Sequence, residues 1–133
     1  MCVLDARPAL SQAVLMSLFA AYVIVTIATI LANAWAAIAD LAQARFVLAT
    51  MGEVGVPRSW LPPLGILKGA AAAGLLIGLL GMRPLGIAAA LGLVLFFIGA
   101  LATHVRARVF HNIAAPATFF ALAAASAALA ILG

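Results

Sequence analysis

Long uncharged runs dominate the pattern of hydrophobic and polar positions along this chain. Between Arg7 and Asp40 lie 32 uncharged residues, between Arg83 and Arg106 lie 22, and 25 follow Arg108. A helix that crosses the hydrocarbon core of a bilayer needs about 20 consecutive apolar residues. The pattern therefore predicts four membrane-spanning helices, at residues 10–34, 61–81, 84–105 and 114–132.

Proline and glycine residues mark the predicted breaks between these helices. Pro57 and the pair Pro62 and Pro63 interrupt the chain before the second helix, because proline disfavours helix at the residue preceding it. The link from Gly81 to Pro84 is short, and proline suits the first turn of a new helix. Hydrocarbon offers no partner to an unpaired backbone group, so the spans have to be helical. We expect an all-α, integral membrane four-helix bundle, with residues 1–133 forming a single domain.

Residues 35–56, between the first two spans, follow a different pattern. Large apolar residues alternate there with polar and charged ones: Trp35, Ile38, Phe46, Val47 and Met51 with Asp40, Gln43, Arg45 and Glu53. Such a mixture is typical of an interfacial amphipathic helix. We predict that this segment either covers the end of the bundle as a loop helix or forms a half-buried lid. Trp60, just beyond it, suits an aromatic anchor at head-group depth.

Composition narrows the class of protein. Hydrophobic residues make up 68% of the 133 residues and charged residues 8%, whereas a soluble domain is about half apolar and about a quarter charged. So few charges exclude a soluble enzyme, a nucleic-acid-binding protein and a disordered linker. Cys2 is the lone cysteine, which excludes an internal disulfide and a Cys/His metal cluster. We expect no metal and no cofactor.

Loop charges predict how the protein sits in the membrane. The first and third loops share one side and carry four arginines, whereas the other side carries two: Arg45, Arg58, Arg106 and Arg108 against Arg7 and Arg83. Positive residues accumulate on the cytoplasmic side. The count favours cytoplasmic first and third loops, with both termini outside.

Polar residues follow one face of the first predicted helix. Tyr22, Thr26, Thr29 and Asn33 are spaced i, i+4, i+7 and i+11, which keeps them within roughly 60° of one another at 100° per residue. Asp40 continues this face if the helix persists. Polar groups inside a membrane usually face the protein interior. The stripe is either a set of interhelical hydrogen bonds or a surface that lines a ligand.

A group of polar residues is expected at one end of the bundle. Lys68 lies about two turns into the second helix, where an ammonium has to reach the interface or find a partner. His104 lies in the last turn of the third helix, where it either complements the helix dipole or exchanges protons. Because the helices alternate in direction, both residues fall at the end where Asp40 lies. We assign acid–base roles to Lys68, His104 and Asp40, and substrate binding to Asn33, Tyr22, Thr26, Thr29, Glu53, Trp60 and Arg106.

Several stretches of this chain resemble the DoxX-like family of small bacterial membrane proteins. They are Leu64 to Ala71, Gly74 to Leu79, Val94 to Ala100 and Thr103 to Arg108, and the similarity covers roughly residues 15–130. The resemblance implies a four-helix bundle in the bacterial cytoplasmic membrane. The family name comes from a subunit of a quinone-reducing thiosulfate oxidoreductase. Many members carry an acidic residue where this chain has Lys68.

These observations leave three functional hypotheses. The first is a protein that binds, and converts by isomerisation, hydrolysis or cyclisation, a lipophilic substrate that enters from the bilayer. The second is an accessory subunit that anchors a membrane redox complex. Small-residue pairs on the second helix, Gly65/Gly69 and Gly74/Gly78, suit close packing within the bundle, against a second copy or against such a partner subunit. A transporter or channel is the third and weakest, because no charged ring or broken helix pair is visible.

Overall fold

The computed structural model describes residues 2–132, with side chains from residue 11 onward, and this part of the chain is helical without strands. Four long helices are accompanied by a shorter helix and a single 3-10 turn. Their bounds are α1 Cys2–Leu41, α2 Arg45–Val54, η1 Arg58–Trp60, α3 Leu61–Leu79, α4 Arg83–Arg106 and α5 Ala114–Leu132. The four long helices are long and apolar enough to cross a membrane. The predicted all-α membrane bundle is thereby confirmed.

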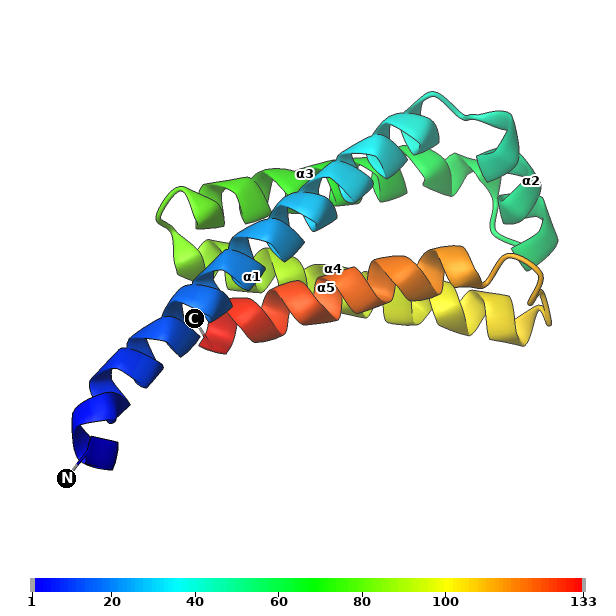
Figure 1. The fold of residues 1–133 in the computed structure, drawn as a ribbon. Coiled ribbons are helices and arrows are strands. Elements are labelled where there is room, and N and C mark those ends of the chain that lie inside the picture. Colours follow the sequence, from blue (N-terminus) through cyan, green and yellow to red (C-terminus); the bar gives the residue numbers. More distant parts are fainter. Residues whose placement is uncertain (1, 133) are drawn as a thin grey trace.

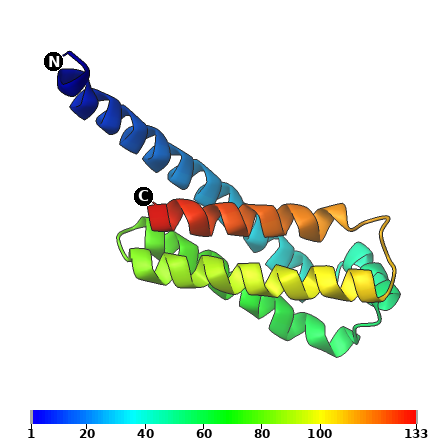
Figure 2. The same cartoon turned by 90° about the horizontal axis from the view of Figure 1, so that it is seen from below.

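The long helices form a ring in which α1 and α4 each pack against both α3 and α5. Figures 1 and 2 show α3, α4 and α5 running side by side, whereas α1 crosses them obliquely. The N-terminal part of α1 projects beyond the end of the bundle where α5 finishes (Figure 1). The short helix α2 lies at the opposite end, against the loop between α4 and α5. The short helix, the 3-10 turn and one end of each long helix therefore come together at that opposite end.

The first helix is longer than the sequence pattern predicts. We expected it to end at residue 34, but α1 continues to Leu41. The interfacial segment is correspondingly shorter, with α2 covering only Arg45–Val54. A charge such as Asp40 usually marks the end of a span, but here its carboxylate pairs with Lys68 of α3 inside the bundle. This pairing removes the reason for the helix to stop before it.

Successive helices end in the same hydrogen-bonding motif. After α1, the Ala44 N–H donates to the Ala39 carbonyl at 3.0 Å and the Gln43 N–H donates to the Asp40 carbonyl at 3.1 Å. This pair of bonds defines a Schellman motif, whose residue after the helix is left-handed. Gln43 has a φ of 52° as required, and Gly55 after α2 has a φ of 75°. The motif reverses the chain sharply enough to bring α2 back over the bundle end.

Small residues allow the closest helix approach. A Cβ built on Gly78 of α3 would lie 2.5 Å from the Cα of Gly86 on α4, and one on Gly74 would lie 2.9 Å from the Cβ of Ala89. No side chain fits there, so the backbones of α3 and α4 are in direct contact. Larger side chains, including Leu75, Leu93 and Phe97, form the buried core cluster of the bundle.

Candidate functional site

A buried ion pair joins α1 to α3. The Nζ atom of Lys68 lies 2.9 Å from Oδ2 of Asp40, and the two side chains are 14% and 6% exposed. Lys68 was expected to reach the interface or find a partner, and the structure gives it Asp40. The ammonium also lies 5.3 Å from the ring centre of Phe96, within the range of a cation–π contact. Carboxylate and aromatic ring together hold the ammonium in a fixed position.

The imidazole of His104 is buried, with half of its hydrogen bonding satisfied. It lies in the last turn of α4, as predicted, and Nδ1 is 2.9 Å from the carbonyl oxygen of Ala100. The Nε2 atom is buried and has no hydrogen-bond partner in the described part of the chain. A buried polar atom left without a partner costs about 1–3 kcal/mol. Such an atom in a folded protein calls for a water, an ion or a ligand.

A cavity of about 610 Å³ opens between these groups. Its volume lies within the usual range for small-molecule sites, about 300–1,000 Å³. The wall is mostly apolar and draws on every helix of the bundle. Its polar and aromatic members are Trp35, Asp40, Phe46, Thr50, Trp60, Lys68, Phe96, Phe97, Thr103, His104, Asn112 and Phe119.

Helix α2 covers one side of this cavity. Phe46, Val47, Thr50, Met51 and Val54, all from α2, line its wall. The helix is amphipathic and half-buried, which fits the predicted cover over the bundle end. At its start the ring of Phe46 stacks on Trp35 of α1, with the ring centres 5.6 Å apart. On this side the cavity is therefore bounded by a short helix, whereas the spanning helices form most of the rest of its wall.

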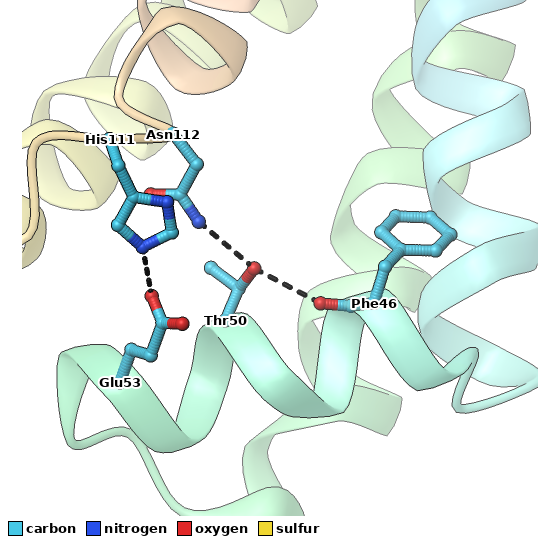
Figure 3. A network of polar contacts seen from close by, with 5 residues as sticks. All are labelled: Phe46, Thr50, Glu53, His111 and Asn112. Atoms are coloured by element: carbon cyan, nitrogen blue, oxygen red, sulfur yellow. Dashed lines mark hydrogen bonds and ion pairs between the residues drawn. The ribbon is translucent and has the colours of Figure 1, made fainter.

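Polar contacts tie α2 to the loop between α4 and α5. His111 Nε2 lies 2.6 Å from Glu53 Oε2, and the Asn112 amide donates to the Thr50 hydroxyl at 3.3 Å. Thr50 in turn donates to the carbonyl of Phe46 within α2 (Figure 3). The Glu53–His111 pair is open to solvent, with the side chains 41% and 67% exposed. These contacts are here called the α2 latch, and its Glu53–His111 pair is of the weak, solvent-exposed kind.

Four of the predicted site residues line the cavity together: Asp40, Trp60, Lys68 and His104. They come from α1, η1, α3 and α4, so the structure brings together groups that are far apart in the sequence. Glu53 and Arg106 lie at the same end but outside the wall. Glu53 belongs to the α2 latch, and Arg106 is exposed at the end of α4. Their role in substrate binding stays a prediction.

The polar stripe of α1 is buried, as predicted, but lies away from the cavity wall. Thr29 Oγ1 is 2.8 Å from Ser126 Oγ of α5 and donates to the Val25 carbonyl at 2.7 Å. The Asn33 amide donates to the Thr29 carbonyl at 2.9 Å. The Tyr22 ring lies 4.5 Å from the guanidinium carbon of Arg83. Of the two interpretations, interhelical hydrogen bonding describes Thr29, and the role of Tyr22, Thr29 and Asn33 in substrate binding stays a prediction.

Thr26 completes the stripe as a buried residue whose hydroxyl has no partner in the described part of the chain. It is 1% exposed and does not line the cavity. Its role in ligand binding also stays a prediction.

Some residues of the cavity wall were not assigned to the site from the sequence. Trp35 and Asn112 line it, as do Phe96 and Phe97 beneath the Lys68 ammonium. An aromatic pair within an apolar span resembles ordinary lipid-facing sequence, so only its position beside a charge reveals its part in the site. Within the described part of the chain, no group of three or more His, Cys, Asp and Glu side chains is placed to hold a metal ion.

The fold defines a small multi-pass membrane protein, and one end of its bundle holds a cavity with a few polar residues on its wall. The model of the DoxX-like family matches residues 24–126, which is most of the chain, and the protein belongs to that family. Searches among curated proteins and among solved structures found no match.

Proposed function

We propose that this protein binds a lipophilic small molecule with a polar head group in the cavity at the α2 end of the bundle, in the bacterial cytoplasmic membrane. The observation that carries the proposal is a mostly apolar cavity of about 610 Å³ whose wall holds the Lys68–Asp40 pair and His104. Binding sites for small molecules combine such apolar walls with a few placed polar groups. The apolar wall would hold the body of the ligand, and the polar groups its head.

The cost of keeping Lys68 in a span supports a functional role. An ammonium near the bilayer centre costs roughly 2.5–3.5 kcal/mol on insertion scales. A hydrophobic pair in place of Lys68 and Asp40 would pack the bundle without that cost. A charge held rigidly beside a cavity is useful when it donates to an oxygen of a ligand, because a fixed donor needs no reorganisation on binding.

Conversion of the bound molecule by proton transfer is the second candidate function. Lys68, Asp40 and His104 are all titratable side chains on the wall of one cavity. Isomerisation or cyclisation by acid–base catalysis needs placed side chains that take up a proton and return it. The set of residues suits such a reaction better than it suits electron transfer. Binding is the common requirement and is tested first.

Two glycines of α4 provide a matched pair of variants for this test. Gly99 lines the cavity, whereas Gly92 does not, and a Cβ on either residue meets nothing within 4 Å. Gly99→Leu should therefore project into the cavity and reduce its volume without a clash at Cβ, and Gly92→Leu adds the same side chain elsewhere on the helix. The probe is bromoundecanol, added to the protein in phosphatidylcholine nanodiscs. Its bromine quenches the fluorescence of Trp35 and Trp60, which both line the cavity.

We expect saturable quenching for the wild-type protein and for Gly92→Leu, and an affinity at least about tenfold weaker for Gly99→Leu, since a side chain that projects into the cavity competes with the probe for space. Quenching that never saturates, or that is equal in all three proteins, would place the probe in the bilayer only and contradict the proposal.

A further inference from the structure

The hydrogen bond of His104 shows which of its two ring nitrogens is left without a hydrogen-bond partner. Nδ1 lies 2.9 Å from the carbonyl oxygen of Ala100, which can only accept, so Nδ1 carries the hydrogen of this bond. In a neutral imidazole one nitrogen donates and the other accepts. Nε2, buried and without a partner in the described part of the chain, is therefore an acceptor when the ring is neutral.

His104 has no carboxylate partner of its own on the cavity wall. The residue is 6% exposed. Asp40 is the one acidic residue on the cavity wall among the described residues, and its carboxylate already pairs with Lys68 at 2.9 Å. Nε2 of the neutral ring is thus left as an acceptor without a partner in the described part of the chain.

Asn112 presents a second free acceptor on the same wall. Thr50 gives its hydroxyl hydrogen to the Phe46 carbonyl, so its oxygen accepts from the Asn112 amide nitrogen at 3.3 Å. This contact assigns the amide orientation and leaves Oδ1 of Asn112 buried without a partner in the described part of the chain. His104 and Asn112, both on the wall of this cavity, thus each hold an acceptor without a partner, and a hydrogen donor is the group that matches such an acceptor.

We propose that the cavity selects a lipophilic alcohol or phenol, whose hydroxyl donates to Nε2 of His104. The inference rests on the proposed function, since it names the head group of the ligand bound there. A ketone, ester or ether has no hydrogen to donate and would leave Nε2 unpaired. A hydroxyl oxygen also has lone pairs for the Lys68 ammonium, which has three hydrogens and uses one on Asp40. A hydroxyl is the simplest uncharged group that matches both an acceptor and a donor on the wall.

The test compares bromoundecanol with its methyl ether, which differ in the hydroxyl hydrogen. Both are titrated into the protein in phosphatidylcholine nanodiscs, and quenching of Trp35 and Trp60 gives the two dissociation constants. The readout is the alcohol-to-ether preference in wild-type protein and in His104→Phe, because the ratio between proteins cancels the different partition of the probes into lipid. His111→Phe is the matched control, since His111 is exposed and does not line the cavity, and the loss of its contact in the α2 latch affects both probes alike and cancels in the preference.

We expect His104→Phe to lower the preference for the alcohol about tenfold, as for the loss of a buried hydrogen bond, and His111→Phe to leave it unchanged. If His104→Phe does not fold, nitrogen NMR of isotope-labelled histidine in the wild-type protein decides. The alcohol, but not the ether, should then shift the Nε2 signal of His104.

Saturable binding of both probes with the same preference in wild-type protein and His104→Phe would overturn the hydroxyl assignment and leave the proposed cavity function intact. An Nε2 signal that responds equally to the alcohol and the ether would also overturn it. Absence of saturable quenching by either probe in the wild-type protein would instead contradict the proposed function and, with it, this inference.

Discussion

At the scale of single residues, the Lys68–Asp40 pair links stability to the site. Asp40→Asn leaves a buried ammonium without its counter-charge, which we expect to lower the free energy of unfolding by about 3–5 kcal/mol. The double variant Asp40→Leu with Lys68→Met removes both charges and should recover most of that loss. Titration with a denaturing detergent, followed by circular dichroism, measures both. A single variant as stable as the wild-type protein would show that the pair does not form.

Thr29 and Ser126 test the structural interpretation of the polar stripe. Ser126→Ala removes the 2.8 Å hydrogen bond between α1 and α5 but leaves Thr29 its bond to the Val25 carbonyl. Interhelical hydrogen bonds in membranes contribute about 0.6 kcal/mol on average. We expect a stability loss of that size, measured by the same titration, with unchanged affinity for bromoundecanol. A large loss of affinity at constant stability would assign the stripe to the ligand instead.

At the scale of elements, the contact between α3 and α4 depends on Gly78 and Gly86. A Cβ on Gly78 would lie 2.5 Å from the backbone of Gly86, so Gly78→Ala has to push the helices apart. Such overpacking typically costs about 1–3 kcal/mol. Gly92→Ala is the matched control on α4, because its Cβ meets nothing within 4 Å and alanine favours helix over glycine. Equal stability of the two variants in the detergent titration would refute the direct backbone contact.

Helix α2 is held over the cavity by the α2 latch of Glu53, His111, Thr50 and Asn112, whose ion pair is exposed. Exposed ion pairs are worth little, about 0.2–1 kcal/mol, so the latch can open without unfolding the bundle. We expect Glu53→Gln to speed probe dissociation by roughly two- to fivefold, at unchanged helix content. Stopped-flow recovery of tryptophan fluorescence measures the rate. Arg45→Gln, on α2 but outside the cavity wall, is the control, and equal rates in all three proteins would mean that the ligand does not pass α2.

At the scale of the whole molecule, the four spans and their class followed from the sequence because charges and prolines interrupt apolar runs about as long as a bilayer is thick. The burial of the α1 stripe followed from helical spacing. The end of α1 could not be predicted from the sequence, because Asp40 is neutralised by a residue 28 positions away, which no local pattern shows. The cavity also depends on how side chains from six elements fit together. Sequence spacing thus located the polar end of the bundle, and the structure selected which of its residues surround a cavity.

The central claim is that this cavity holds a lipophilic molecule, and mass spectrometry of small molecules extracted from the gently purified protein tests it most directly. Wild-type protein and Gly92→Leu should carry a near-stoichiometric non-phospholipid compound, whereas Gly99→Leu should carry much less because its side chain projects into the cavity and competes for space. Bulk phospholipid alone, in equal amounts for all three proteins, would contradict the account and favour an accessory subunit whose partner remains to be found.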